Sequence, residues 1–235
     1  QVMGYILSFA RNLHAYARRQ LERRYEPEGG SAARVDFASG PGVVNAMDRA
    51  TIYLPRATMG IVGMGGIGLE VARRASAFGM TIRGVDRHPD RIEKPDFVDR
   101  IEGVDRLDDL LAWSDFVVIA APHTPETERL FDAGRLARMR PSSYLVNIGR
   151  GAIVVLDDLV AALRAGKLAG AALDVYEVEP LPEDHPLWGF PNVILTPHTA
   201  GYSPIVAERH RALLVDNLGR FARGEPLRNA VDKAL

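Results

Sequence analysis

The feature that most constrains the fold is the glycine-rich stretch 63–68, GMGGIG, which joins an apolar run to a helical pattern. The run before it, 58–62, is typical of a buried strand, and after it apolar residues recur every three or four positions up to Phe78, as on one face of a helix. Such glycines permit a tight turn, a close approach of the backbone to a diphosphate, and close packing of helix on strand. The free N–H groups at the helix start would face the phosphates.

An acidic residue lies where such a unit would need one. A second apolar run, 80–85, ends at Asp86, which is 18 residues after Gly68. A carboxylate there would bind the ribose hydroxyls and would disfavour a 2′-phosphate, so the sequence favours NAD over NADP. Arg87 leaves NADP possible, because an arginine can accommodate that phosphate. The alternative interpretation is an ordinary glycine-rich turn followed by a strand-end aspartate.

The rest of the chain alternates between strand and helix patterns, which predicts an α/β fold with a doubly wound parallel sheet of about seven strands. We expect one amphipathic helix over 1–25, a connecting arm over 26–57, a dinucleotide-binding domain with the catalytic residues over 58–202, and a helix and tail over 203–235. The first helix has no cap, as if the chain were cut inside an element. We also expect an edge strand at Phe97-Val98 and a last helix that has Ser203 as its N-cap and Pro204 in its first turn.

Composition narrows the class of function. The 235 residues contain 29 basic and 30 acidic residues, spread along the chain, which gives no sign of a nucleic-acid or anionic membrane surface. The apolar runs are too short to span a bilayer. The absence of cysteine excludes disulfides, thiolate metal sites and a cysteine nucleophile, and it fits a cytoplasmic enzyme. We expect no metal site, because no pair of His or acidic residues has ligand spacing on one helix face.

Candidate catalytic residues follow several of the predicted strands, where ligands bind in doubly wound sheets. His198 is the candidate proton donor and acceptor, because histidine as a residue type is suited to acid/base chemistry near neutral pH. Arg150 can clamp a carboxylate and polarise the neighbouring carbonyl. Glu179 can pair with His198, orient its ring and raise its pKa. Taken singly, each of these also fits an ordinary structural residue; we expect His123 to form a wall of the cofactor site.

These residues stand in motifs that resemble the D-isomer-specific 2-hydroxyacid dehydrogenases, a family that includes glyoxylate/hydroxypyruvate reductases. The motifs, in family order, are GMGGIG at 63–68, HTPET at 123–127, NIGRG at 147–151, LDVY at 173–176, EPLP at 179–182 and TPH at 196–198. The resemblance implies that Arg150 binds substrate, that His198 is the general acid/base supported by Glu179, and that Asp174 holds the nicotinamide carboxamide. It implies that the cofactor is bound by Gly63, Gly65, Gly66, Ile67, Gly68, Asp86, Arg87, Pro122, Thr124, Thr127, Ile148, Gly149, Asp174 and Gly201.

Three departures from the family pattern affect these expectations. Gly66 stands where relatives often have a polar side chain, and His123 replaces an apolar residue. The family also has an N-terminal substrate domain of roughly a hundred residues before the first helix, and the sequence does not contain it. We therefore expect this chain to bind NAD but to turn over slowly.

The resemblance leaves three functional alternatives. The first is an NAD-dependent 2-hydroxyacid dehydrogenase that acts on a small 2-keto or 2-hydroxy acid. The second is an NAD(H)-binding regulator without turnover, which an intact catalytic set disfavours. The third is formate oxidation, which a carboxylate rather than an amide at Glu179 disfavours. We also expect a homodimer, with the first helix and the arm at its interface.

Overall fold

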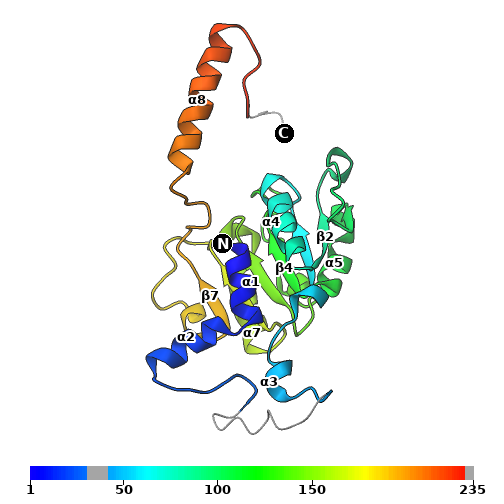
Figure 1. The fold of residues 1–235 in the computed structure, drawn as a ribbon, viewed down its shortest axis with the longest axis vertical. Helices are drawn as coiled ribbons and strands as arrows, with labels where there is room; N and C mark the ends of the chain where they lie inside the picture. The colour runs from blue at the N-terminus through cyan, green and yellow to red at the C-terminus, as the bar shows by residue number, and fades with distance from the viewer. Residues whose placement is uncertain (31–41, 231–235) are drawn as a thin grey trace. The chain divides into compact units, whose positions relative to one another are not determined.

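The computed structural model describes residues 1–30 and 42–230, which form two compact units, Gln1–Ala200 and Gly201–Leu235. Within the described residues, the first unit contains a seven-stranded sheet in which every neighbouring pair is parallel (Figure 1). Its order is β3-β2-β1-β4-β5-β6-β7, so the predicted doubly wound α/β fold is confirmed. The strands are β1 Thr58–Val62, β2 Thr81–Val85, β3 Arg100–Glu102, β4 Phe116–Ile119, β5 Tyr144–Asn147, β6 Gly170–Leu173 and β7 Val193–Leu195.

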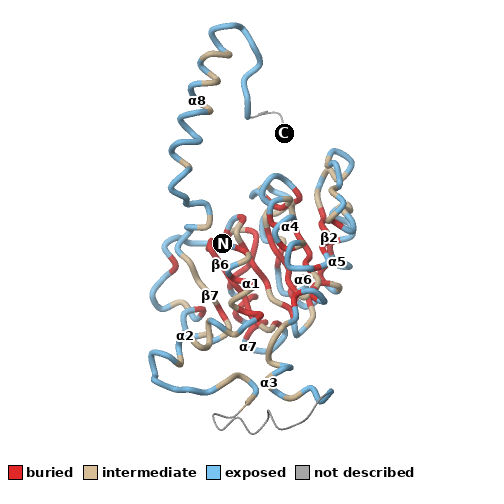
Figure 2. Tube along the Cα trace, in the orientation of Figure 1, coloured by how far each residue is buried: buried red, intermediate tan, exposed pale blue. Residues whose placement is uncertain are grey.

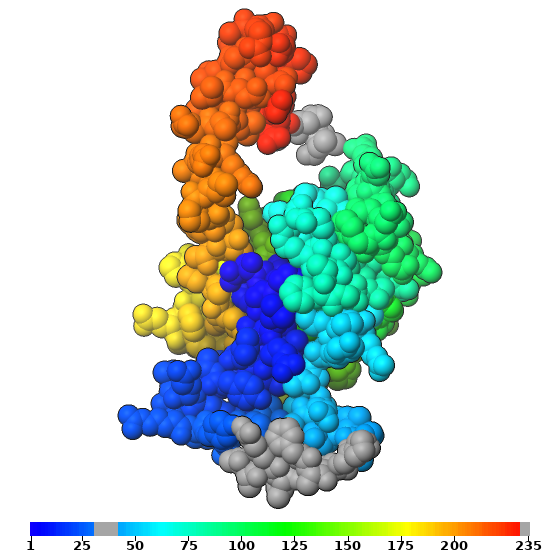
Figure 3. Space-filling model, viewed as in Figure 1, coloured from blue at the N-terminus to red at the C-terminus, as the bar shows by residue number. Residues whose placement is uncertain are grey.

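Helices cover both faces of this sheet because successive strand residues point to opposite sides. In β4, Phe116 and Val118 pack into one apolar cluster with α1 (Val2–Ala10) and α4 (Gly66–Ala77). Val117 and Ile119 pack into the other cluster, with α5 (Leu107–Trp113), α6 (Ala133–Leu136) and α7 (Leu156–Arg164). Figure 3 shows α1, in dark blue, beside α4 on the visible face. The short 3-10 helices are η2 Leu54–Arg56, η3 Pro89–Arg91, η4 Val104–Arg106, η5 Gly151–Ile153 and η6 Pro186–Gly189.

The expectation of one helix over 1–25 is wrong, because the chain turns at Asn12. Asn12 has a left-handed backbone (φ 56°), and its side-chain amide donates to the carbonyl of Ala50 at 2.6 Å. The turn separates α1 from α2 (Leu13–Leu21). Apolar residues continue at helical spacing through both helices, but α1 buries its apolar face and α2 has no buried residue. Part of the arm, 31–41, lies outside the described residues; α3 (Ala46–Arg49) follows it.

The predicted position of the edge strand is also wrong. The edge strand is β3, where Arg100 pairs with Arg83 of β2, and not Phe97-Val98. Val98 is buried, but its N–H donates to the carbonyl of Pro95 in a turn that precedes the strand. The apolar pair therefore marks a buried residue, Val98, but it places the start of the strand three residues before Arg100.

The second unit contains α8, Val206–Ala222, whose N-cap residue is Ile205 and which has no side-chain cap. Ser203 is therefore not the predicted cap; its carbonyl accepts a hydrogen bond from Val206 N–H at 3.1 Å. Figure 2 colours α8 as exposed or intermediate along its length, in contrast to the buried strands of the first unit. Over the described ranges, no helix is both long and apolar enough to cross a membrane.

Candidate active site

The glycine turn after β1 has the backbone that the sequence predicts. Gly63 has φ 93°, and a Cβ there would lie 2.7 Å from the Cα of Ala121. A Cβ on Gly68 would lie 2.1 Å from the carbonyl oxygen of Gly63, so α4 packs directly on the turn. At Gly65 and Gly66 a Cβ would meet no atom within 4 Å. A side chain at Gly63 or Gly68 would therefore clash with the protein backbone. Gly65 and Gly66, at the N-terminus of α4, face open space.

A cavity of 480 Å³ opens beside this turn, at the carboxyl ends of β1, β2 and β4. In the order β2-β1-β4 the direction of winding reverses at β1, and this is where doubly wound sheets bind ligands. The residues around the cavity include seven that the sequence predicts to bind a cofactor. They are Gly63, Gly65, Asp86, Arg87, Pro122, Thr124 and Thr127.

Asp86 holds the glycine turn as well as lining the cavity. Its Oδ2 accepts from the backbone N–H of Met64 at 2.9 Å, and its Oδ1 accepts from the N–H of His88 at 3.0 Å. Each carboxylate oxygen has two lone pairs, so each keeps one for a ligand. His88 is a residue of this site that the sequence analysis does not single out. His88 lines the same cavity, and only its backbone position after Asp86 could have indicated this.

The wall opposite Asp86 is formed by the segment after β4. Thr127 folds it back, since its hydroxyl donates to the carbonyl of Pro122 at 2.8 Å and accepts from Thr124 N–H at 2.8 Å. Arg87 lies 3.7 Å from the carboxylate of Glu126 on this segment. His123, expected to form a wall of the site, does not line the cavity; its ring is partly exposed and lies 3.8 Å from Glu128.

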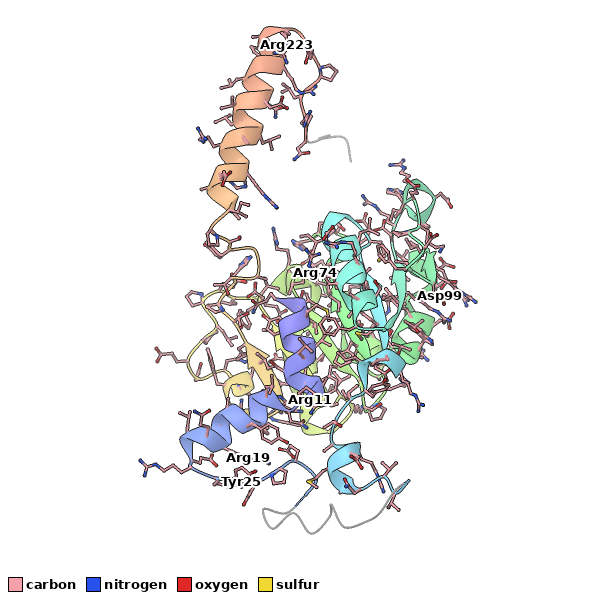
Figure 4. All side chains as sticks on the ribbon, viewed as in Figure 1. Arg11, Arg19, Tyr25, Arg74, Asp99 and Arg223 are labelled. Atoms are coloured by element: carbon pink, nitrogen blue, oxygen red, sulfur yellow. The ribbon has the colours of Figure 1, made fainter. Side chains whose placement is uncertain are left out.

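A second cavity, of 290 Å³, lies on the other side of the glycine turn. It is lined by Gly66, Ile67 and Ile148, which are predicted cofactor residues, together with the start of α1. Arg74, labelled in Figure 4, also lines it, but the guanidinium of Arg74 is ion-paired with Glu70 one turn earlier on α4. An anion near Gly66 would therefore be bound mainly by backbone N–H groups. This agrees with the sequence, in which position 66 is a glycine and has no polar side chain.

The turn after β5 presents Arg150. The buried Asn147 shapes this turn, because its side-chain oxygen accepts from Gly149 N–H and its amide donates to the carbonyl of Arg150, both at 3.0 Å. The guanidinium of Arg150 is exposed and donates to the carbonyl of Gly149 at 2.7 Å. Within 1–30 and 42–230 it forms no ion pair with an acidic side chain. It is therefore available to an external carboxylate.

Glu179 and His198 are in direct contact, as the sequence predicts. Nδ1 of His198 lies 2.8 Å from Oε2 of Glu179, and the other carboxylate oxygen accepts from Tyr176 N–H at 3.0 Å. Partial burial favours the neutral form of Glu179, but these two hydrogen bonds outweigh burial and lower its pKa. The carboxylate therefore stays ionised beside the ring, with Nδ1 facing it and Nε2 free of it.

The Arg150 turn and the Glu179 loop are packed against each other. A Cβ on Gly151 would lie 1.8 Å from the carbonyl oxygen of Tyr176, so only glycine fits next to Arg150. Arg150, Asp174 and His198 follow β5, β6 and β7, three adjacent strands whose axes lie about 4.8 Å apart. Two predicted catalytic residues, Arg150 and His198, and the predicted cofactor residue Asp174 thus lie at the carboxyl ends of adjacent strands.

Asp174 is almost completely buried, with 1% exposure. Its carboxylate accepts from the hydroxyl of Thr196 and from the N–H groups of Thr199 and Ala200. Asp174 therefore holds the turn that carries His198, in addition to the cofactor role that the family resemblance implies. Gly201, the last predicted cofactor residue, begins the second unit and stays a prediction. Among the described residues, no group of three or more His or acidic side chains could hold a metal ion.

The comparisons with known proteins agree with this geometry. Residues 3–200 match the family model described as D-isomer specific 2-hydroxyacid dehydrogenase, NAD binding domain. The chain belongs to this family. The glycine turn, Arg150, Glu179 and His198 all lie within the matched range.

Similar proteins include both curated relatives and solved structures. A glyoxylate reductase from Korarchaeum cryptofilum is 43% identical over 178 residues, which cover 75% of this chain and 52% of the relative. A family structure from Xanthobacter autotrophicus, in complex with NADPH and MES, has a TM-score of 0.80 at 33% identity, over 98% of this chain and 85% of the other. An NADPH-dependent glyoxylate/hydroxypyruvate reductase from Sinorhizobium meliloti, with NADP and sulfate, has a TM-score of 0.75 at 29% identity, over 99% and 67%. The chain spans about half the length of the curated relatives it matches.

Proposed function

We propose that the chain binds a nicotinamide dinucleotide and interconverts a small 2-keto acid, of the glyoxylate or hydroxypyruvate class, and its 2-hydroxy acid. The observation that carries the proposal is the 2.8 Å contact between Glu179 and His198 on the sheet edge that also bears the glycine turn and Arg150. An acid/base pair, a free arginine and a diphosphate-binding turn are the groups that this reaction requires.

The residues present fit the cofactor. Gly65 and Gly66 leave open space at the N-terminus of α4, which suits a diphosphate, and Asp86 offers one lone pair on each carboxylate oxygen to ribose hydroxyls. Bound nicotinamide supplies or accepts the hydride at C2 of the acid. Seven other predicted cofactor residues line the two cavities beside the glycine turn, namely Gly63, Ile67, Arg87, Pro122, Thr124, Thr127 and Ile148. Gly68, Gly149 and Asp174 line neither cavity.

The protein residues handle the substrate and the proton. In the reducing direction Nε2 of His198 donates a proton to the carbonyl oxygen, and in the oxidising direction it removes the proton from the hydroxyl. Glu179 keeps the ring oriented through Nδ1 and stabilises its protonated form. Arg150 binds the substrate carboxylate with paired N–H groups and polarises the adjacent carbonyl.

We propose that NAD is preferred to NADP. Support comes from the Asp86 carboxylate, which would repel a 2′-phosphate, and from Glu126, which lies beside Arg87 and partly neutralises it. The solved structures from Xanthobacter and Sinorhizobium hold NADPH or NADP, so the preference has to be measured with both cofactors.

We further propose that the chain forms a homodimer through α2 and the described part of the arm. Support comes from large apolar side chains that are more than half exposed there: Leu13, Leu21, Val43, Val44 and Tyr53. A cavity of 640 Å³ in this region is lined in part by Tyr16, Pro27 and Met47. Light scattering at micromolar concentration would give twice the 25.7 kDa chain mass, and a Leu21→Glu variant would lower it.

Fluorescence titration with NADH and NADPH, beside glyoxylate-dependent oxidation of NADH, tests the central proposal. We expect binding of NADH by the unaltered chain and loss of turnover in His198→Asn with cofactor affinity retained. His210→Asn, on α8, is the matched control. Binding with no detectable turnover would favour the NAD(H)-binding regulator, and failure to bind either cofactor at millimolar concentration would contradict both alternatives.

A further inference from the structure

A chain of hydrogen-bonded polar groups links α1 to the turn that carries His198. The hydroxyl of Tyr5, on α1, is hydrogen-bonded to the hydroxyl of Thr196, which donates to Oδ1 of Asp174 at 2.5 Å. Tyr5 is 3% exposed and Asp174 is 1% exposed. The sequence separation between Tyr5 and Thr196 is 191 residues, so the link exists only in the folded chain.

Which hydroxyl donates in each hydrogen bond of this link follows from the one proton that each hydroxyl carries. An ionised carboxylate only accepts, so Thr196 uses its single proton toward Asp174. The bond between Tyr5 and Thr196 must then be donated by the phenol. Burial raises the pKa of Tyr5, although its hydrogen bond with Thr196 opposes this, so the phenol keeps its proton at neutral pH.

The end of the link fixes the backbone around His198. Asp174 accepts from His198 N–H through its carbonyl at 2.8 Å, and from Thr199 and Ala200 through its carboxylate at 2.9 and 2.8 Å. His198 has a left-handed backbone (φ 52°), which a non-glycine residue adopts at a cost in free energy. Such a conformation persists only where its surroundings determine it, and here Asp174 does so.

We propose that Tyr5 is a positioning residue for His198, acting through Thr196 and Asp174 on the turn at the end of β7. This inference rests on the proposed function, since it concerns the ring that would move the proton. Loss of the phenol hydroxyl removes the hydrogen bond that the hydroxyl of Thr196 receives from the buried side of this site, where Tyr5 is 3% exposed. The amide of Gln1, 3.5 Å from Thr196, is the remaining donor at that hydroxyl. The Thr196–Asp174 bond then loses its orientation, and the His198 turn becomes mobile.

Tyr144→Phe provides a matched control for Tyr5→Phe. The ring of Tyr144 stacks on Phe9 of α1, with ring centroids 4.4 Å apart. In the described part of the chain, the hydroxyl of Tyr144 forms no hydrogen bond. Both variants therefore remove one hydroxyl from beside α1, but only Tyr5→Phe cuts the link. A second pair keeps or removes the middle group: Thr196→Ser retains the hydroxyl, and Thr196→Val removes it.

Nitrogen NMR of the imidazole in the 235-residue chain gives a readout that does not depend on turnover. The chain has six histidines, and His198→Asn assigns the signal of His198. In the unaltered chain, Tyr144→Phe and Thr196→Ser, we expect one ring form with the proton on Nδ1, facing Glu179. In Tyr5→Phe and Thr196→Val, we expect averaging between the two ring tautomers, with glyoxylate turnover at least tenfold lower and NADH affinity within twofold.

Two results would overturn the inference. One is a His198 signal in Tyr5→Phe that matches the unaltered chain; the other is an equal change in Tyr144→Phe. If the unaltered chain binds no cofactor, the proposed function fails, but the imidazole signals still show whether Tyr5 orders the His198 turn. If Thr196→Val does not fold, Tyr5→Phe against Tyr144→Phe still decides the question.

Discussion

Asp86 accepts the backbone N–H of Met64 at 2.9 Å, so the residue predicted to choose the cofactor also holds the turn that would bind its diphosphate. The same carboxylate accepts from His88 N–H at 3.0 Å. Selectivity and turn geometry are thus coupled in one side chain, and a substitution at Asp86 acts on both.

Asp86→Ala is expected to weaken NADH binding at least tenfold more than NADPH binding. In the proposed site the carboxylate would bind ribose hydroxyls of NADH, whereas its charge would oppose the 2′-phosphate of NADPH. Loss of the hydrogen bond to Met64 N–H should also lower the affinity for both cofactors, by a smaller factor that is the same for NADH and NADPH. Titration of both cofactors measures the ratio, with the exposed Asp90→Ala as control. Equal losses for the two cofactors would show that Asp86 only holds the turn.

Glu179 makes a pH-dependent contribution to stability. Its folded pKa is lowered, because the hydrogen bonds from His198 and Tyr176 N–H outweigh the opposing effect of burial. A lowered carboxyl pKa stabilises the fold above the unfolded value of 4.5, and this contribution is lost as pH falls through the folded pKa.

The stability difference between the unaltered chain and Glu179→Gln should therefore shrink as pH falls below 4.5. Thermal unfolding from about pH 7 to about pH 3.5 measures it, and Glu183→Gln, on an exposed loop residue, is the control. A difference that stays constant across this range would mean that the paired carboxylate does not contribute through its charge.

The parts that the sequence predicts well are those that depend on local pattern. A continuous apolar run such as 116–119 indicates a fully buried strand, and glycines at fixed offsets such as Gly63 and Gly68 indicate a tight turn. Both features are present in the structure. The pair of Glu179 and His198 was also predictable, because parallel strands bring their carboxyl ends to one edge.

The parts that the sequence does not predict depend on distant contacts. The break between α1 and α2 follows from the Asn12 amide binding the Ala50 carbonyl, 38 residues away, and periodicity carries no trace of it. The link from Tyr5 to Thr196 is hidden for the same reason, since Tyr5 looks like one more apolar position on a helix face. The local sequence pattern is therefore enough to predict the strands and the end of the sheet that carries the site. The positioning residues can be found only from tertiary contacts.

Gly68→Ala is expected to destabilise the first unit by about 1–3 kcal/mol, the range for overpacking, and to weaken NADH binding. The added Cβ would lie 2.1 Å from the Gly63 carbonyl oxygen, and relief would require α4 to move away from the glycine turn. Gly4→Ala is the matched control, because Gly4 lies inside α1 with no atom within 4 Å of the new Cβ. It should gain about 0.5–1 kcal/mol from helix propensity. Urea unfolding measures the stability of both variants, and titration measures their affinity for NADH. If Gly68→Ala leaves both quantities unchanged, the contact between α4 and the glycine turn is loose.

Arg150→Lys tests whether the arginine is a carboxylate clamp or only a positive charge. The guanidinium spends one N–H on the carbonyl of Gly149 at 2.7 Å and has others free for two parallel bonds to a carboxylate. Lysine keeps the charge but cannot reproduce the fork, so KM for glyoxylate should rise about 10- to 100-fold, equivalent to about 1.4–2.7 kcal/mol, while NADH affinity stays within twofold. Initial rates over a range of glyoxylate concentrations measure this, with Arg138→Lys, at an exposed arginine near Asp108, as control. A near-normal KM and kcat in Arg150→Lys would assign the substrate carboxylate to a different residue, and an equal rise with Arg138→Lys would point to long-range charge rather than to the fork.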